Sequence, residues 1–186
     1  MVRRTDRNRT KPVIRLAPEL VPEPLWHISG YHLLTRGAWK SIRARVLAKS
    51  KGACAICGAV QEKGMVCHEV WHYQGSKRIA TLASLRLICP DCNRVHHIGM
   101  TQLLMPERYE PTIRHMARVN GFPTAIAREF VERAFEVWRR RSATQWRTAI
   151  APRLKRRFPQ LAVAAGRIEK PRAGARRVRA RSGQPW

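Results

Sequence analysis

Residues 53–60 read ACAICGAV and residues 85–97 read LRLICPDCNRVHH, so that each stretch contains one Cys-x-x-Cys pair. Four thiolates from two such turns form a complete tetrahedral ligand set for one zinc ion. Structural zinc contributes about 10–16 kcal/mol to small zinc-binding folds, so the loss of one thiolate should damage folding first. The sequence therefore predicts a structural zinc site, with the ligands Cys54, Cys57, Cys89 and Cys92.

The segments around the two cysteine pairs have the pattern of a hairpin followed by a helix. Residues 63–73 and 79–88 are rich in aliphatic or aromatic residues, and the polar residues between them predict a turn. Pro90 is favourable in the first turn of a helix, which we expect to continue past His97 to residues 100–104. This order of elements predicts an α+β fold in which zinc fastens the entrance of the hairpin to the start of the helix.

Further helices are predicted on both sides of this unit. Before it, the apolar residues of segment 39–49 recur with helical spacing. After it, helical patterns occupy residues 111–119, 123–140 and 142–150. Several prolines in residues 16–25 predict an extended arm instead of a helix.

The charge of the chain indicates a polyanionic partner. The 186 residues include 37 Lys and Arg against 12 Asp and Glu, which gives a net charge of +25. Residues 1–15 carry net +5 and residues 161–186 carry net +6, and both segments are expected to be disordered basic tails. Because the body of the chain is basic as well, we expect nucleic acid as the partner, with an acidic protein as the alternative.

The use of cysteine and the lack of long apolar segments predict a cytoplasmic protein without a membrane span. Only Cys67 lies outside the two pairs, which is typical of metal-bound thiolates in a reducing compartment and not of a disulfide scaffold. The sequence contains neither a run of 18 apolar residues nor the apolar core of a signal peptide.

A second group of polar residues lies outside the cysteine quartet. His68 and Glu69 are neighbours on the first predicted strand, and on a regular strand neighbours point to opposite faces. Asn93 and His97 are four residues apart and would share one face of the predicted helix. If that helix packs across the hairpin, this face meets His68. The result would be a set of nitrogen and oxygen ligands beside an imidazole that can accept a proton near neutral pH.

The layout of these motifs resembles the HNH endonucleases, which have the ββα-metal fold, and in particular a bacterial group of small zinc-binding HNH proteins. The matching motifs are HEVWHY at residues 68–73, CPDCNRVHHIG at residues 89–99 and VNG at residues 119–121. Asn93 stands where this group has His, and small residues stand where the family name has its Asn. The resemblance covers residues 22–155.

The resemblance predicts a ββα core with a structural zinc, flanked by an N-terminal helix and C-terminal helices. It divides the chain into four parts, which are a basic N-terminal arm (1–21), an HNH nuclease domain (22–110), a C-terminal helical extension (111–155) and an Arg-rich disordered tail (156–186).

The resemblance also implies metal-dependent hydrolysis of phosphodiester bonds, with double-stranded DNA as the expected substrate. His68 would take the proton of the attacking water. A divalent cation, Mg²⁺ or another, would be held by Asn93 and His97 with Glu69 as a further ligand. If His68 is a ligand instead, Glu69 takes the position of the base. Two alternatives remain, namely a catalytically inactive zinc-stabilised nucleic-acid-binding protein and a component of a larger phage or mobile-element assembly.

Overall fold

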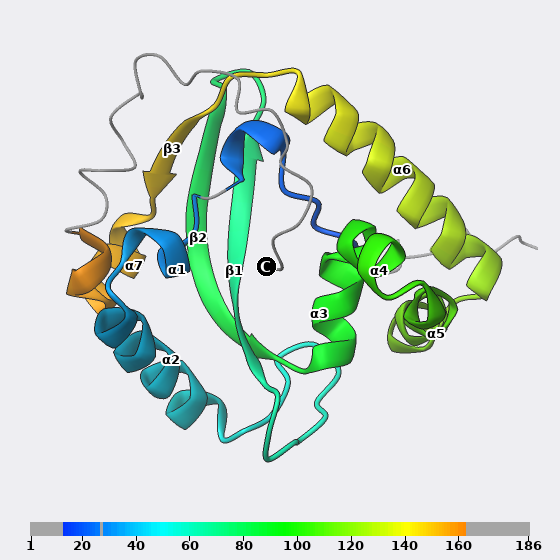
Figure 1. The fold of residues 1–186 in the computed structure, drawn as a ribbon, viewed down its shortest axis with the longest axis horizontal. Helices are drawn as coiled ribbons and strands as arrows, with labels where there is room; N and C mark the ends of the chain where they lie inside the picture. Colours follow the sequence, from blue (N-terminus) through cyan, green and yellow to red (C-terminus); the bar gives the residue numbers. More distant parts are fainter. Residues whose placement is uncertain (1–12, 27, 163–186) are drawn as a thin grey trace, which may run out of the picture.

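The computed structural model describes residues 13–26 and 28–162 and has an α+β fold built around a long, curved β hairpin (Figure 1). Strand β1 (Val66–Gln74) pairs antiparallel with β2 (Ile79–Ile88). Strand β3 (Arg147–Ile150) adds to the other edge of β2 in parallel. The predicted hairpin is therefore confirmed, and the bounds of its second strand agree with those predicted.

Helices cover both sides of the hairpin (Figure 1). On one side, α2 (Arg36–Ser50) contacts both long strands, and on the other side α3 (Pro90–His96) contacts β1. The hydroxyl oxygen of Thr35 caps α2 by accepting the backbone N–H of Ala38. The remaining helical segments are η1 (Glu23–Leu25), α1 (Gly30–Leu33), α4 (Ile98–Leu104), α5 (Pro106–Asn120), α6 (Thr124–Ser142) and α7 (Pro152–Arg157).

The single helix predicted from residue 90 to residues 100–104 is wrong, because the chain forms two helices there. The backbone of His97, with φ −104° and ψ 39°, leaves helical geometry between α3 and α4. The hydroxyl of Thr101 donates to the carbonyl oxygens of Arg94 and His97 and so satisfies groups near the break. The backbone N–H of His97 still donates to the carbonyl of Asn93, so the break affects the backbone angles of His97 and not its place one turn after Asn93.

The short helix predicted over residues 142–150 is also wrong. Helix α6 continues to Ser142, and the segment after it forms β3 along residues 79–82 of β2. Thr148 and Ile150 are buried, whereas Arg147 is exposed. The alternation of buried and less buried side chains covers only four residues, which is too short to identify a strand in the sequence. The segment forms a strand because the edge of β2 is free to pair with it.

The N-terminal arm packs against the body of the protein. The side-chain oxygen of Asn120 accepts the backbone N–H groups of Arg15 and Leu16, and its amide donates to the carbonyl of Leu16. Leu16 is fully buried. Further along the arm, the backbone N–H of Glu19 donates to the carbonyl of His96 at 3.0 Å. Residues 16–22 of the arm form no helix, as predicted, and lie beside the end of α3, whereas residues 23–25, which were also predicted to be extended, form the 3₁₀ helix η1.

The core joins residues from the arm to the last described helix. Leu16, Ile42, Ile113, Phe158 and Leu161 belong to one cluster of buried apolar side chains. The ordered chain therefore extends beyond the boundary expected at residue 156. The rest of the two expected tails, residues 1–12 and 163–186, lies outside the described residues. No helix in the described part of the chain has the length and apolar character needed to cross a membrane.

Candidate metal centre and histidine cluster

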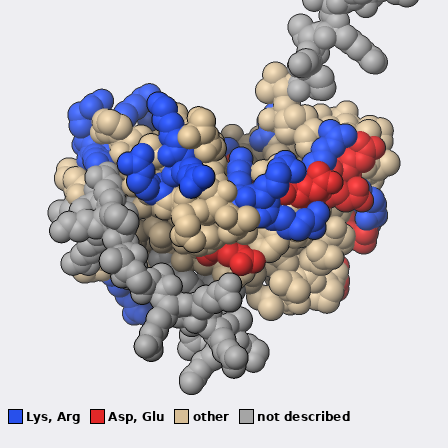
Figure 2. All heavy atoms as spheres, turned by 90° about the horizontal axis from the view of Figure 1, so that it is seen from above, with Lys and Arg blue, Asp and Glu red and all other residues tan. Residues whose placement is uncertain are grey.

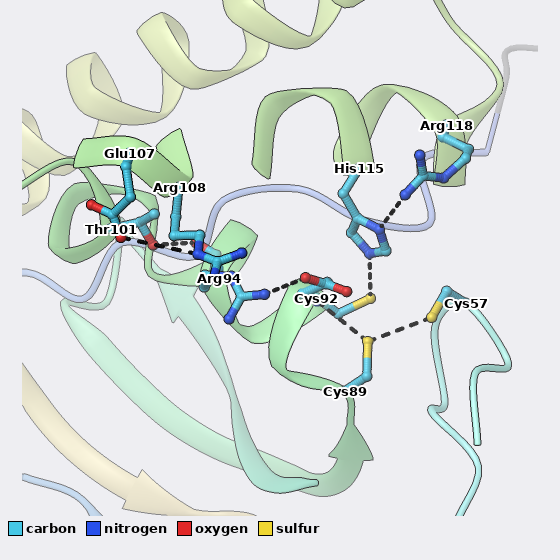
Figure 3. Close-up of polar contacts among 10 residues, drawn as sticks. Cys57, Cys89, Cys92, Arg94, Thr101, Glu107, Arg108, His115 and Arg118 are labelled. Atoms are coloured by element: carbon cyan, nitrogen blue, oxygen red, sulfur yellow. Dashed lines mark hydrogen bonds and ion pairs between the residues drawn. The ribbon is translucent and has the colours of Figure 1, made fainter. Parts of the chain in front are cut away.

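The four paired cysteines converge, as the sequence predicted, where the hairpin meets the start of α3, and Figure 3 shows three of them, Cys57, Cys89 and Cys92. The Sγ atoms of Cys54, Cys57, Cys89 and Cys92 all lie within 4.8 Å of one another. The Cys57 and Cys89 sulfurs are 3.6 Å apart. Zn–S bonds of about 2.3 Å give a tetrahedral edge of about 3.8 Å, whereas a disulfide bond is only about 2.05 Å long. The quartet could therefore hold a zinc ion.

Backbone hydrogen bonds fix the two cysteine turns in place. The first turn closes with a bond from the N–H of Gly58 to the carbonyl of Cys54, and Gly58 takes a φ of 78° that favours glycine. The N–H of Ala55 donates to the carbonyl of Leu87 at 2.9 Å, which attaches this turn to β2. In the second turn, Cys89 caps α3 by accepting the N–H of the residue three positions later. Both turns are therefore tied to the same end of β2.

The chemistry of the sulfur atoms fits a divalent cation. Burial raises the pKa of the Cys89 thiol to about 11. Burial and the neighbouring sulfur charges raise the pKa of Cys92 as well. Burial also acts to raise the pKa of Cys54, but hydrogen bonds from backbone groups outweigh it and lower this pKa to about 7. Four thiolates at this spacing need a positive ion to offset their repulsion, and zinc is the ion that such a set prefers.

Two residues of α5 support the quartet, and the sequence analysis did not identify them. The Nε2 atom of His115 lies 3.3 Å from the Sγ atom of Cys92, and a guanidinium nitrogen of Arg118 lies 3.2 Å from Nδ1 of His115 (Figure 3). Arginine only donates, so Nδ1 accepts, and the neutral ring carries its proton on Nε2. Burial lowers the pKa of His115 and so favours this neutral form. His115 therefore donates a hydrogen bond to the sulfur of Cys92.

A cluster of three histidines occupies the side of the hairpin that faces α3. The ring of His68 stacks on that of His96, with centroids 4.4 Å apart and planes 13° from parallel. The ring of His97 meets His68 edge to face, with a centroid separation of 5.7 Å. His68 is 6% exposed and His96 is 1% exposed. The structure thus brings together two of the predicted site residues, His68 and His97, and adds His96.

Glu19 from the N-terminal arm connects this cluster to Arg86. One carboxylate oxygen of Glu19 lies 3.1 Å from Nε2 of His68, and the other lies 3.0 Å from a guanidinium nitrogen of Arg86. The same guanidinium nitrogen lies 3.0 Å from Nε2 of His96. Arg86 is also the cross-strand partner of His68 in the hairpin. The cluster is therefore assembled from the arm, both long strands and the end of α3.

The hydrogen-bond partners determine where the ring protons lie. Arg86 can only donate, so Nε2 of His96 accepts, and neutral His96 carries its proton on Nδ1. This buried Nδ1 has no hydrogen-bond partner among the described residues, and it lies 3.7 Å from the Glu19 carboxylate. The ionised Glu19 carboxylate can only accept, so Nε2 of His68 donates to it. In the neutral His68 ring, the free lone pair is therefore on Nδ1.

The charges of the cluster follow from burial and from these contacts. Burial acts to raise the pKa of Glu19, but the hydrogen bond from His68 and nearby positive charge, including that of Arg86, outweigh it and keep this pKa below its ordinary value. Burial, with a smaller contribution from the charge of His68, lowers the pKa of His96 to about 3 and that of His97 to about 4. Both rings are neutral at neutral pH, as a metal ligand must be.

Glu69 is not brought to the histidine cluster. One of its carboxylate oxygens accepts the backbone N–H of Gly30 at 2.6 Å, and the other accepts the indole N–H of Trp71 at 3.1 Å. Burial raises its pKa. A Cβ atom at Gly30 would lie 2.8 Å from the Trp39 ring, so only glycine allows the backbone to approach Glu69 in this way. The register of the hairpin shifts only between Val70 and Trp71, after His68 and Glu69. This bulge therefore does not turn Glu69 towards His68.

Cys67 lies outside the quartet, as predicted. Burial and the nearby charge of Glu69 raise the pKa of its thiol to about 12. A buried thiol with a high pKa is a weak nucleophile and a weak ligand. Cys67 is therefore a packing residue of the hairpin.

Asn93 and His97 remain candidates for a second metal site. The backbone N–H of His97 donates to the carbonyl of Asn93 at 3.0 Å, so the two residues are one helical turn apart. Within the described residues, the side chain of Asn93 makes no hydrogen bond that would compete with a ligand. An amide oxygen and a neutral imidazole are a mixed donor set, which suits a transition metal such as Mn²⁺ better than Mg²⁺.

Glu19, His68 and His96 form a second group whose ligand atoms lie within 4.8 Å of one another. Their proton positions do not suit a cation. Nδ1 of His96 carries a proton while Arg86 occupies Nε2, and the Arg86 guanidinium lies against the same carboxylate. A metal ion here would have to displace the arginine. We therefore interpret this group as a hydrogen-bond network.

A pocket of about 410 Å³ opens beside Glu19. Its walls are formed by Pro18, Glu19, Val70, Trp71, His72, Tyr73 and Arg141. The guanidinium of Arg141 lies over the ring of Tyr73, 4.3 Å from its centroid. No ion pair joins this half-buried guanidinium to a carboxylate of the described residues, so it is available to an anionic oxygen.

Comparisons of the chain with protein-family models, with curated proteins and with solved structures found no match. The site is therefore interpreted from its own geometry.

Proposed function

We propose that the protein is a metal-dependent phosphodiesterase of the HNH type that cleaves nucleic acid, with double-stranded DNA as the expected substrate. One observation carries the proposal: Glu19 holds Nε2 of His68 at 3.1 Å, which leaves Nδ1 as the basic nitrogen of a ring that meets His97 edge to face. An imidazole oriented by a carboxylate is a common general base, because its tautomer and direction are fixed before the substrate binds.

The order of elements around the cysteine quartet supports the HNH assignment. A hairpin, β1 and β2, is followed directly by α3, and the quartet joins the hairpin entrance to the first turn of that helix. This is the order that the resemblance to the ββα-metal fold predicts. In such a unit the strand supplies the base and the helix supplies metal ligands, which matches His68 on β1 and Asn93 with His97 on and after α3.

In the proposed reaction, Nδ1 of His68 takes the proton of the water that attacks phosphorus. Glu19 stabilises the resulting imidazolium, because its carboxylate already accepts the proton on Nε2. A divalent cation held by Asn93 and His97 would supply charge stabilisation for the phosphate oxygens. Arg141, on the wall of the adjoining pocket, is suited to contact a neighbouring phosphate.

Glu69 is a less suitable base than His68. Both of its oxygens already accept hydrogen bonds, from Gly30 and from Trp71. Any role as a metal ligand would require it to leave these partners and to cross to the other side of the strand. We therefore assign Glu69 to the support of β1 and α1.

The charge distribution supports a nucleic-acid partner. Figure 2 shows basic side chains without acidic neighbours over the upper left of the molecule, whereas basic and acidic side chains mix on the right, the side of α6. Surfaces of one sign attract a polyanion and raise its rate of association.

A non-catalytic, zinc-stabilised nucleic-acid-binding protein is the second candidate. The observation that favours it is the burial of His68, which is 6% exposed and lies under Glu19 of the arm. In that case the Glu19 network would only fasten the arm to the hairpin. Nothing in the described residues bears on a third role as a component of a phage or mobile-element assembly.

Nicking of supercoiled plasmid separates the two candidates. The zinc-loaded protein should nick plasmid in the presence of Mn²⁺ or Mg²⁺, with faster nicking in Mn²⁺. His68→Ala should slow this step by about 10²–10⁴-fold, the usual contribution of a general base. Glu19→Gln should slow it less, because the amide oxygen can still accept from Nε2. Glu23→Gln, the same change elsewhere in the arm, is the matched control and should have no effect.

Equal nicking by the parent protein and His68→Ala would refute the assignment of the base. DNA binding without nicking by the parent protein, in either cation, would favour the non-catalytic candidate.

A further inference from the structure

Two stretches of the chain carry basic residues and no acidic ones. No Asp or Glu lies between Glu23 and Glu62, and none lies between Glu136 and Glu169. The first stretch contains α2, and the second contains β3 and α7. These stretches are far apart in the sequence, so their charge matters as a surface only if the fold brings them together.

The fold does bring α2 and α7 together (Figure 1). The guanidinium of Arg45 on α2 lies over the ring of Phe158, which ends α7, at 5.1 Å from its centroid. Arg157 lies at the same distance from the same ring. We name the exposed surface of these two helices the α2/α7 face and define it by six exposed residues: Arg45 and Lys49 on the flank of α2 next to α7, Arg36 and Lys40 on the other flank of α2, and Arg153 and Arg156 on α7.

On the opposite side of the molecule, some of the basic residues form ion pairs with carboxylates. On α5 and α6, Arg128 pairs with Glu110, and Arg133 pairs with Glu129 at 3.4 Å. No ion pair joins any of the six residues of the α2/α7 face to a carboxylate among the described residues. The α2/α7 face is therefore an uncompensated positive surface, whereas part of the basic charge on α5 and α6 is neutralised by neighbouring carboxylates.

The α2/α7 face is separate from the histidine cluster. Helix α2 contacts the hairpin from one side, while α3 and the cluster lie on the other side (Figure 1). A mononucleotide at His68 could not reach both surfaces, so the ligand of this face must be extended. Helix α2 has 15 residues and is therefore about 22 Å long, a length over which duplex DNA presents about 13 phosphate charges.

The side chains of the face favour a duplex over a single strand. Proteins that bind single strands stack the bases on exposed aromatic rings. Neither α2 nor α7 exposes an aromatic side chain, because Trp39 is half-buried and Phe158 is fully buried. Between the charged residues, α2 exposes the small side chains of Ala44 and Ala48, which leave room for a phosphate backbone, and the larger side chain of Leu47.

We propose that the α2/α7 face binds the phosphate backbone of duplex DNA at a segment away from the cleaved bond. The inference rests on the proposed function for the identity of the polyanion. It adds a second contact surface, which would anchor a long duplex while the histidine cluster acts on another part of it.

Two variants with the same loss of charge test the proposal. The face variant combines Lys40→Gln, Lys49→Gln, Arg153→Gln and Arg156→Gln. The control variant combines Arg108→Gln, Arg114→Gln, Arg128→Gln and Arg133→Gln on α5 and α6. Both lower the net charge by four but at different places on the surface, and the control variant also removes the ion pairs of Arg128 and Arg133. Equal zinc content and equal melting temperatures would show that both variants are folded.

The measurement is the affinity for fluorescent duplex DNA at several salt concentrations. The face variant should bind a duplex of about 40 base pairs at least tenfold more weakly at moderate salt, and its slope of log affinity against log salt should fall by about 3–4. The control variant should keep nearly the slope of the parent protein. A duplex of about 10 base pairs, which cannot span both surfaces, should show a smaller difference between the variants.

Equal losses in the two variants would mean that only net charge matters and would overturn the proposal, as would an unchanged affinity of the face variant. If the face variant loses more affinity for single-stranded DNA than for duplex DNA, the choice of duplex DNA as the ligand is overturned. Nicking at saturating plasmid should be unchanged in the face variant. If the parent protein does not nick plasmid, the proposed function fails. The comparison of DNA affinities would still show whether the α2/α7 face binds duplex DNA.

Discussion

Replacement of His115 by Phe would remove one hydrogen bond from the cysteine quartet and leave a ring of similar size in its place. Nε2 of His115 lies 3.3 Å from Sγ of Cys92, and the two residues are 8% and 0% exposed. A hydrogen bond to a charged acceptor contributes about 1.5–3 kcal/mol, which corresponds to an affinity for zinc about 10- to 150-fold weaker. Arg118→Leu should weaken zinc binding less, because it keeps the His115 ring and removes only the contact that fixes the ring proton on Nε2.

The assay is competition for zinc with a chromophoric chelator at neutral pH. The spectrum of the cobalt-substituted protein would report whether four sulfur ligands are still present. We expect weaker zinc binding with an unchanged tetrahedral cobalt spectrum. His115→Phe with the zinc affinity of the parent protein would refute the assigned hydrogen bond. A cobalt spectrum with altered ligands would show instead that the substitution disturbs the quartet itself.

Three further predictions concern residues outside the quartet. Glu69→Ala should lower the free energy of unfolding in urea by about 1–3 kcal/mol for each donor that it leaves unpaired, at Gly30 and Trp71; full stability combined with lost nicking would show that Glu69 is catalytic. Phe158→Ala should lower the free energy of unfolding by about 3–5 kcal/mol, because this ring is 0% exposed; a loss below about 1 kcal/mol would contradict its place in the core. Arg141→Met should raise the DNA concentration needed for half-maximal nicking, and the exposed neighbour Arg140, changed in the same way, should not; equal effects would remove Arg141 from the proposed phosphate contact.

The parts of the structure that the sequence predicted are those determined by local patterns. The apolar run of β2 and the Pro-containing start of α3 are local, and the spacing of the cysteines is the one that a zinc site needs. The break at His97 was not predictable in this way, because both halves of segment 90–104 have helical patterns. Strand β3 was missed because its pairing depends on the free edge of β2, which is distant in the sequence.

The candidate site was predictable only in part, for the same reason. His68 and His97 stand in recognisable motifs, but Glu19 lies 49 residues before His68 in a segment whose only visible features are proline and charge. Arg86 could have been identified as the partner of His68 from the hairpin register. That register shifts by one residue at Val70 and Trp71, however, and the sequence gives no sign of the shift. Contacts of this kind come from tertiary structure.

The position of the quartet explains how a structural metal can matter for the histidine cluster without touching it. Cys89 follows the last residue of β2 directly, and α3 then runs for 7 residues from Pro90 to His96, a length of about 10 Å. Zinc bound at the start of α3 would therefore help to fix the distance between β2, which carries Arg86, and the end of α3, which carries His96. The arm attaches to the same end of α3 through the bond from Glu19 to the carbonyl of His96. With zinc bound, the stack of His96 on His68 would be held from two directions, by the quartet at the start of α3 and by the arm at its end.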